Sequence, residues 1–200
     1  MDSLQKLQEM FERFPGIGPR QAGRFVHFLL RSSPSLRREL AKEIQNLGGA
    51  IKQCADCRRF FGGANDRCAI CASPRRERET LMVVISDSDV DAIDHAGSYN
   101  GLYFVLGGST QFGSDKQSVP NERALVESLK THLSEIQEII FALPANPEGD
   151  STEQHVRALF APILKESDVR ITVLGRGLST GSELEYADAE TIKNALKNRT

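Results

Sequence analysis

The residues of this chain best suited to chemistry are its four cysteines, which all lie within one stretch of eighteen residues. They form two C-x-x-C pairs separated by ten residues: Cys54, Cys57, Cys68 and Cys71. Each C-x-x-C turn directs two thiolates to one point, and an intervening hairpin brings the second pair to the same ion, so the spacing predicts a tetrahedral zinc site. Because four protein thiolates leave no position open for water, we expect one structural Zn²⁺ per chain.

The alternative for these cysteines is a pair of disulfides, which is typical of small secreted proteins. The chain begins MDSLQKLQEMFERF, without the apolar stretch or cleavage site of a secretory signal peptide. No apolar run approaches the length of a membrane span. We therefore expect reduced cysteines that bind zinc, in a protein of the cytoplasm.

A glycine-rich turn followed by two arginines is the second feature with a chemical use. In the segment PGIGPRQAGR, Gly16 and Gly18 leave backbone N–H groups uncovered at the start of a predicted helix, where the helix dipole favours a phosphate. Arg20 and Arg24 share one face of that helix. The pattern is typical of a helix-hairpin-helix that holds DNA by its phosphates without reading bases. A plain helical hairpin is the alternative, but Ile17 between the glycines and the arginines after them favour DNA binding.

Acidic residues follow two predicted strands. The segment SDSDVDAID holds Asp87, Asp89, Asp91 and Asp94, and the segment NPEGDSTE holds Glu148, Asp150 and Glu153. Carboxylates at the C-terminal ends of neighbouring parallel strands could hold Mg²⁺ for phosphoryl chemistry. Aspartates also favour helix N-termini, and both segments lie near a predicted helix start. We favour helix capping over a magnesium site.

Composition and charge narrow the class of protein. With 200 residues, 40% of them hydrophobic and 26% charged, the chain can bury a core in one or two domains. The net charge of −2 is unevenly distributed. Residues 1–80 hold 15 Lys+Arg and 9 Asp+Glu, whereas residues 81–200 hold 10 and 18. A basic N-terminal part fits a polyanionic partner such as DNA.

Two kinds of periodicity show which elements position these residues. Before the cysteines, apolar residues at helical spacing predict helices over 4–14, from 20 to about 30, and over 36–47, the last ended by Gly48 and Gly49. After residue 80, strands alternate with helices, which predicts a parallel α/β sheet with right-handed crossovers. The predicted strands are 81–86, 103–106, 138–143 and 169–175, and the predicted helices are 87–96, 121–135, 151–166 and a short one from 188.

Taken together, these segments resemble one family along nearly the whole chain. The matching motifs are FPGIGPRQAGRFVHFLL, CADCRRFF, CAICASPRRERETLMVV, GLYFVLGG and GLSTGSELEYAD. They are similar to the bacterial recombination mediator family RecR. The resemblance implies a helix-hairpin-helix, a four-cysteine zinc finger, a Toprim domain and a C-terminal segment used in assembly. It also implies a ring-like tetramer that acts with RecO or RecF to displace single-strand-binding protein and load recombinase at gaps. The family's DNA-binding basic residues fall on Arg20 and Arg24.

The chain departs from the family pattern at the Toprim acidic residues. The family usually has V-V-E-S at the end of the first Toprim strand, and here Ile85 replaces the glutamate. The second acidic segment, usually N-P-x-x-E-G-E, reads ANPEGD over residues 145–150. Because an isoleucine neither binds a metal nor transfers a proton, the departure argues against a Toprim metal site. It also bears on the RecO contact, to which the resemblance assigns that acidic region.

We therefore predict an α/β protein with four parts. These are a helix-hairpin-helix DNA-binding region (1–53), a four-cysteine zinc finger (54–79), a Toprim-like parallel-sheet domain (80–175) and a C-terminal assembly segment (176–200). The predicted function is a nucleoid-associated DNA-binding recombination mediator, homo-oligomeric and without catalytic residues. The alternatives are a Toprim-type nuclease or primase-like enzyme using Asp89, Glu148 and Asp150, and a zinc-stabilised adaptor without a DNA role. Ile85 argues against the first, and the two arginines argue against the second.

Overall fold

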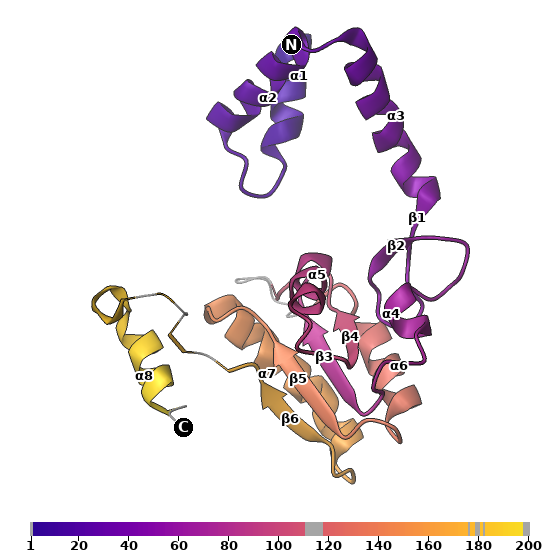
Figure 1. The fold of residues 1–200 in the computed structure, drawn as a ribbon, viewed down its shortest axis with the longest axis vertical. Coiled ribbons are helices and arrows are strands. Elements are labelled where there is room, and N and C mark those ends of the chain that lie inside the picture. The colour runs from indigo at the N-terminus through magenta and orange to yellow at the C-terminus, as the bar shows by residue number, and fades with distance from the viewer. Residues whose placement is uncertain (1, 111–117, 176, 179–180, 182, 198–200) are drawn as a thin grey trace. The chain divides into compact units, whose positions relative to one another are not determined.

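The computed structural model describes residues 2–110, 118–175, 177–178, 181 and 183–197. They divide into two compact units, a helical unit of residues 1–51 and a sheet unit of residues 52–200 (Figure 1). No helix in the described part of the chain is long and apolar enough to cross a membrane.

The helical unit contains three helices: α1 (Ser3–Glu12), α2 (Pro19–Arg31) and α3 (Pro34–Ala50). The ring of Phe11 packs edge-on against Phe14 and Phe25, with centroids 5.8 and 5.6 Å apart, and so joins α1 to α2. The corner between α2 and α3 is closed by Arg37, whose Nη1 donates to the backbone oxygens of Leu29 and Ser32 at 2.9 and 2.6 Å. All three predicted helices are confirmed.

The end of α3 differs from the sequence-based expectation. Gly48 and Gly49 do not stop the helix, which continues to Ala50 and is closed when the N–H of Ile51 donates to the Leu47 carbonyl. A glycine inside a helix costs only about 1 kcal/mol relative to alanine, and nothing packs where its Cβ would lie. The glycine pair is therefore tolerated as helix interior.

The sheet unit is built on four parallel strands in the order β4-β3-β5-β6. These strands are β3 (Thr80–Val84), β4 (Leu102–Val105), β5 (Glu138–Ala142) and β6 (Arg170–Val173). The helices between them are α5 (Asp87–Ala96), α6 (Glu122–His132) and α7 (Pro147–Leu164). The α/β class, the four strands and their parallel pairing are therefore confirmed.

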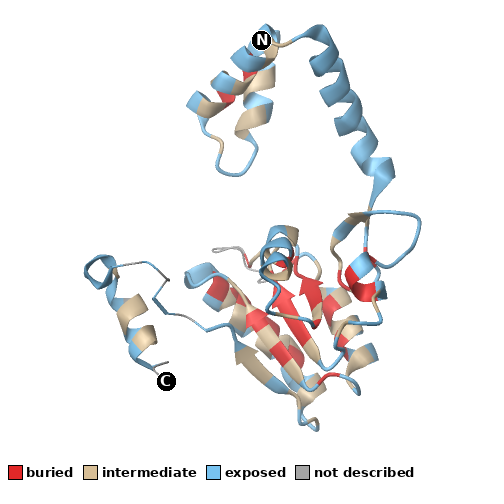
Figure 2. Cartoon of the chain, in the orientation of Figure 1, coloured by how far each residue is buried: buried red, intermediate tan, exposed pale blue. Residues whose placement is uncertain are grey.

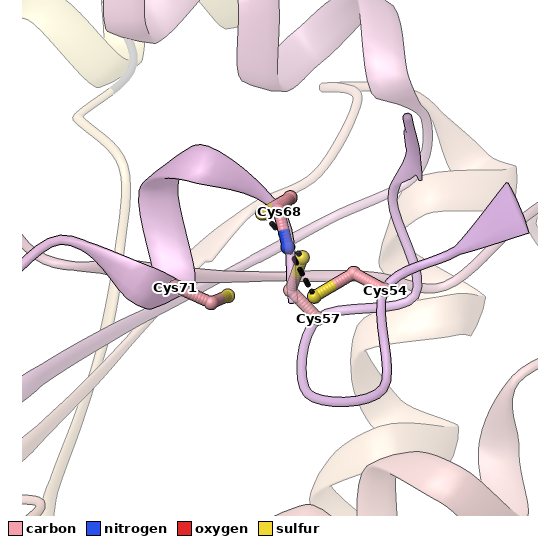
Figure 3. Close-up of side chains that lie close together, drawn as sticks. All are labelled: Cys54, Cys57, Cys68 and Cys71. Carbon is pink, nitrogen blue, oxygen red and sulfur yellow. Dashed lines mark hydrogen bonds between the residues drawn. The ribbon is translucent and has the colours of Figure 1, made fainter. Parts of the chain in front are cut away.

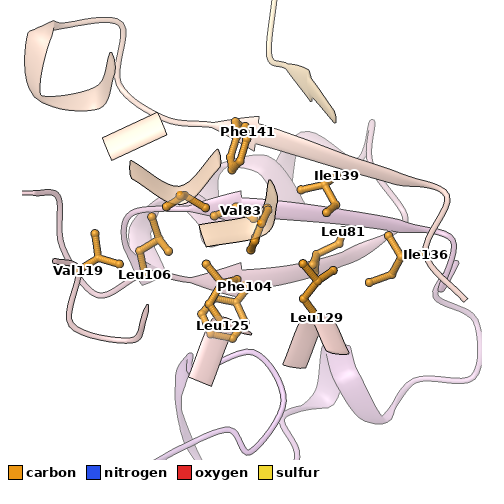
Figure 4. Close-up of a cluster of buried hydrophobic side chains, with 12 residues drawn as sticks. Leu81, Val83, Phe104, Leu106, Val119, Leu125, Leu129, Ile136, Ile139 and Phe141 are labelled. Atoms are coloured by element: carbon orange, nitrogen blue, oxygen red, sulfur yellow. The ribbon is translucent and has the colours of Figure 1, made fainter. Parts of the chain in front are cut away.

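Two apolar clusters form because successive residues of each strand face opposite sides of the sheet. On one side, Leu81 and Val83 of β3 pack in a cluster with residues of α6 and α7, and Figure 4 shows Leu125 and Leu129 of α6 against the strands. On the other side, Met82 and Val84 pack with α5 and with the four cysteines. The cysteine segment is thus part of the core of the sheet unit.

The start of α7 also differs from the expectation of a helix over 151–166 with a capping box at Ser151 or Thr152. The helix begins at Pro147, and its cap is Asn146, whose side chain accepts a hydrogen bond from the N–H of Gly149 at 2.8 Å. Asparagine at the cap followed by proline is a strong helix start. A Cβ at Gly149 would lie 1.9 Å from the Pro144 oxygen, so glycine is needed there for close packing.

Short elements complete the sheet unit. Before β3 lie β1 (Ile51–Gln53), β2 (Phe60–Gly62) and α4 (Ala69–Ala72). Cys54 and Cys57 lie between β1 and β2, Cys68 caps α4, and Cys71 lies within it. In the predicted C-terminal segment 176–200, the described residues form a 3₁₀ turn (Leu184–Tyr186) and α8 (Ala189–Lys197). Residues 176, 179–180, 182 and 198–200 of that segment lie outside the described part of the chain.

Candidate metal centre and nucleic-acid interface

The four cysteines converge on one point (Figure 3). Their sulfurs all lie within 4.8 Å of one another, and every cysteine is buried and free of disulfides. The sulfurs of Cys57 and Cys68 are 3.7 Å apart. Tetrahedral Zn–S bonds of about 2.3 Å would place sulfurs about 3.8 Å apart, so the cluster has the size of a four-thiolate metal site.

Local backbone geometry produces this convergence. Cys54 and Cys57 lie on a turn in which the N–H of Arg58 donates to the Cys54 carbonyl at 3.1 Å. Cys68 caps α4 and Cys71 lies one turn along it, so both sulfurs face the same side. The N–H of Cys68 also donates to the Cys54 sulfur at 3.3 Å, a contact that stabilises a thiolate there.

The closeness of the four thiols shifts their pKa values in opposite directions, lowering those of Cys54 and Cys68 and raising those of Cys57 and Cys71. Hydrogen bonds from Cys57, Cys68 and Cys71 lower the pKa of the Cys54 thiol. Hydrogen bonds among the sulfurs and burial raise the pKa of Cys57 and of Cys71. Four thiolates this close together repel one another, and a soft divalent ion such as zinc fits this donor set and would neutralise their charge.

Three contacts attach the cysteine segment to β4 and α5 of the sheet unit. The N–H of Val105 on edge strand β4 donates to the Cys57 carbonyl at 2.9 Å. Arg59 forms an ion pair with Asp91 of α5, and Arg76 forms one with Asp94 of the same helix. The cluster is consequently held as part of the sheet unit, with α5 as its main support.

The four carboxylates of the first acidic segment all form hydrogen bonds or ion pairs within the sheet unit. The Asp87 carboxylate accepts from the N–H of Phe60 at 2.7 Å, and Asp89 accepts from the Ser86 N–H and hydroxyl at 2.8 and 2.9 Å. Helix capping is therefore confirmed for Asp89, which forms a capping box with Ser86, whereas Asp87 supports the cysteine segment instead. Among the described residues, the four cysteines are close enough together to share a metal ion, and no group of three or more carboxylates is.

Ile85 lies at the end of β3, where a doubly wound sheet places its site. Its side chain is partly buried and packs against the cluster that includes α6 and α7. The position that the family pattern gives to a metal-binding glutamate is here an apolar extension of the core. Burial of this side chain contributes to stability and supplies no ligand.

The glycine turn lies between α1 and α2 as the sequence predicts. Gly16 has a φ of 75°, which favours glycine, and Gly18 caps α2 with a carbonyl that accepts from the N–H groups of Gln21 and Ala22 at 3.0 Å. Arg20 and Arg24 are exposed. Within the described residues neither forms an ion pair, and Arg24 makes one weak contact with Gln21 at 3.5 Å. The two guanidinium groups are thus available to a ligand.

Comparison with known proteins identifies the relatives of this chain. It is 37% identical over 196 residues to "Recombination protein RecR" of Roseiflexus castenholzii, covering 97% of this chain and 91% of the relative. It is 38% identical over 199 residues to the protein of the same name from Prochlorococcus marinus strain MIT 9301, covering 98% and 95%. The chain belongs to the RecR family. A Toprim domain model matches residues 79–175, and a RecR C-terminal model matches residues 177–200.

Membership of the RecR family confirms the resemblance and a role in recombination. The convergence of the four cysteines was predicted from the sequence and is confirmed, but the residues that dock the cysteine segment were missed, above all Arg59 and Arg76. A weak signal was present, because the segment between the cysteines and β3 is rich in arginine (PRRER) and the next helix is rich in aspartate.

Proposed function

We propose that this protein is a DNA-binding mediator of recombinational repair that works by binding and assembly on the nucleoid. In this proposal it forms a ring-like clamp and acts with RecO, RecF or both to load recombinase at gapped or single-stranded DNA. The observation that carries the proposal is the exposed glycine turn with Arg20 and Arg24, in a chain of the RecR family. Family membership alone supports the two named partners.

The chemistry of the turn fits a phosphate backbone. The N–H groups of Gly16 and Gly18 make no backbone hydrogen bond within the described chain, and that of Gly18 lies at the positive end of the α2 dipole. Arg20 and Arg24 lie one helical turn apart on α2, so they can flank the same strand. Such contacts position a protein on DNA without reading its sequence.

Replacing both arginines by alanine is the direct test. Loss of two phosphate contacts should lower the slope of log K against log salt by about 1.8 for duplex DNA, which is about 60-fold in affinity at 0.1 M salt. The loss should be equal for unrelated sequences. Fluorescence anisotropy with two unrelated gapped duplexes over a range of salt concentrations measures both quantities.

The matched control removes two other exposed arginines of the helical unit, by Arg31→Ala with Arg38→Ala. These lie beyond the turn, at the end of α2 and on α3. The proposal fails if Arg20→Ala with Arg24→Ala leaves DNA affinity unchanged. It also fails if the control loses as much, because general charge would then explain the binding.

We propose further that the protein has no catalytic turnover. Support comes from Ile85 in place of the Toprim glutamate and from the hydrogen bonds that engage Asp87 and Asp89. Incubation with Mg²⁺ should give no strand cleavage, no primer synthesis and no ATP hydrolysis. Turnover that is abolished by Asp89→Ala or Asp150→Ala would instead establish a Toprim-type enzyme.

The cysteine cluster is proposed to hold one structural zinc ion.

The helical unit is proposed to join copies of the chain. Few of its side chains are buried: Ala22 and Val26 of α2 are, and none of the described residues of α3 is (Figure 2). A groove of about 500 Å³ opens between α1, α2 and α3 and is lined almost wholly by apolar side chains. So small a unit is marginal without further burial, which a second copy of the same unit would supply.

A further inference from the structure

One residue of the metal centre has a backbone conformation that its side chain disfavours. Among the described residues, Arg58 is the one non-glycine residue with a positive φ, 62°. This left-handed conformation suits glycine, since a Cβ crowds the following carbonyl oxygen. Arg58 directly follows the Cys54–Cys57 turn, so glycine there would form the same turn without strain. Residues held in such conformations cluster at functional sites, which directs attention to the Arg58 side chain.

The Arg58 side chain has no structural partner that explains the strain. It takes part in no ion pair within the described chain, and its Nε is buried without a hydrogen-bond partner. In contrast, its neighbour Arg59 is paired with Asp91 and attaches the segment to α5. Docking therefore uses Arg59, and the charge of Arg58 remains available.

Arg58 lines an open cleft of about 180 Å³ between the cysteine segment and α6. The α6 wall of the cleft includes Ser128, Thr131 and His132. A second, smaller cleft shares Ser128 and His132 with the first and is lined by the exposed Arg78. Two arginines from the cysteine segment thus border one surface along α6, formed by two adjoining clefts that share Ser128 and His132.

The carboxylates in this cleft are already neutralised. Asp56 forms an ion pair with Arg67 at 2.8 Å, and Glu127 forms one with Arg123 at 3.2 Å. Neither Arg58 nor Arg78 has such a partner among the described residues, so the surface keeps a positive balance. An anion that can accept from a planar guanidinium is the ligand that this surface suits.

We propose that Arg58 binds a backbone phosphate of DNA in this cleft, with Arg78 beside it, as a second DNA contact separate from the glycine turn. The inference rests on the proposed DNA-binding function. The basic balance of the cysteine segment, in a chain whose net charge is −2, fits a polyanion, and DNA is the polyanion of the proposed function. Residues 52–80 alone carry 7 Lys+Arg and 4 Asp+Glu, and the glycine turn between α1 and α2 lies outside them.

The test uses Arg58→Gly and Arg58→Asn, because both new residues tolerate a left-handed backbone. In the full-length, zinc-loaded protein, each should lower the salt slope by about 0.9 and DNA affinity by about eightfold at 0.1 M salt, equally for two unrelated gapped duplexes. Thermal unfolding of Arg58→Gly should occur at the wild-type temperature or above it, since strain is relieved. Zinc content and oligomeric mass should not change. Arg75→Ala, which removes an exposed arginine of the same segment outside both clefts, should bind as wild type.

Several results would overturn the proposal. If both Arg58 variants bind DNA with wild-type affinity, Arg58 does not contact DNA, and the carboxylates of a protein partner become the expected ligand of the cleft. A lower unfolding temperature in both variants would show that Arg58 has a structural role. An equal loss of DNA affinity in Arg75→Ala would show that DNA is attracted by the overall positive charge of the segment rather than bound by Arg58. Arg20→Ala with Arg24→Ala, measured in parallel, separates the two hypotheses. If only the Arg20→Ala with Arg24→Ala variant loses DNA affinity, the proposed Arg58 contact is wrong and the proposed function stands. If the wild-type protein binds no DNA, both hypotheses are wrong.

Discussion

Replacing Cys57 and Cys71 by serine is expected to abolish metal binding and to unfold the sheet unit. The four cysteines form a buried cluster with Met82, Val84 and Val90, so the metal would lie within the core. Structural Zn²⁺ binding contributes about 10–16 kcal/mol in small zinc domains, which matches or exceeds the about 5–15 kcal/mol by which domains are stable. Serine supplies no thiolate and leaves hydroxyl groups buried.

Elemental analysis and circular dichroism of protein purified under reducing conditions test this expectation. The wild type should contain one zinc ion per chain and lose its cooperative melting transition in the presence of a chelator. Ala72→Ser is the matched control, because it places a hydroxyl on the exposed side of α4 next to Cys71. Wild-type protein without metal, or a double cysteine variant that melts like the wild type, would show that the cluster is stabilised without zinc.

The same chemistry gives the cluster a pH dependence. Because the pKa of Cys57 and of Cys71 is raised in the metal-free cluster, both thiols must lose protons when a metal binds. Protons therefore compete with the metal, and its affinity falls as pH falls. The sheet unit should accordingly lose stability in acid together with its zinc, which thermal melts and metal analysis over a pH series would measure.

Local patterns carried most of the fold prediction. The strands could be predicted because β3 and β5 are short, largely apolar runs with buried residues, and such runs differ plainly from their polar flanks. Two errors lay at helix ends. Gly48 and Gly49 were expected to stop α3, but the helix continues past them. The helix α7 begins four residues before the expected start, because Asn146 rather than Ser151 or Thr152 caps it.

The convergence of the four cysteines was predictable from sequence for the same reason, since each C-x-x-C turn is local. How the site is attached was not predictable. Arg59 pairs with Asp91 across 32 residues, and Arg76 pairs with Asp94 across 18. Ion pairs between residues of types common on surfaces leave no periodic signal, and only the parallel sheet order brings α5 beside the cysteine segment. The strain at Arg58 was likewise invisible, because a residue type does not reveal its φ angle.

Placing charges in the apolar groove of the helical unit is expected to break the assembly of the protein. Leu40 and Ile44 lie one turn apart on α3, line the groove and are 42% and 60% exposed. If a second copy covers them, Leu40→Asp with Ile44→Asp would place two carboxylates in an apolar interface. In a symmetric pair each copy carries both substitutions, so the free-energy cost of burying the charges is incurred twice. The oligomer should then dissociate to a smaller species.

Native mass measurement at micromolar concentration checks this outcome, with DNA affinity measured on the same samples. Fewer glycine turns per assembly would engage one DNA molecule, so affinity should fall although Arg20 and Arg24 are intact. The control is Gln45→Asp with Asn46→Asp, which adds the same charge to α3 at residues that do not line the groove, and zinc content reports that the sheet unit remains folded.

Two outcomes would contradict the assignment of the groove as the interface between copies. A wild-type protein that is monomeric yet binds DNA tightly would remove the need for a partner copy. Equal dissociation of the Gln45→Asp with Asn46→Asp control would attribute the effect to charge on α3 rather than to its apolar face. Dissociation of the Leu40→Asp with Ile44→Asp variant alone is the result expected if apolar burial holds the copies together, because the two variants carry the same charge and differ only in where α3 carries it.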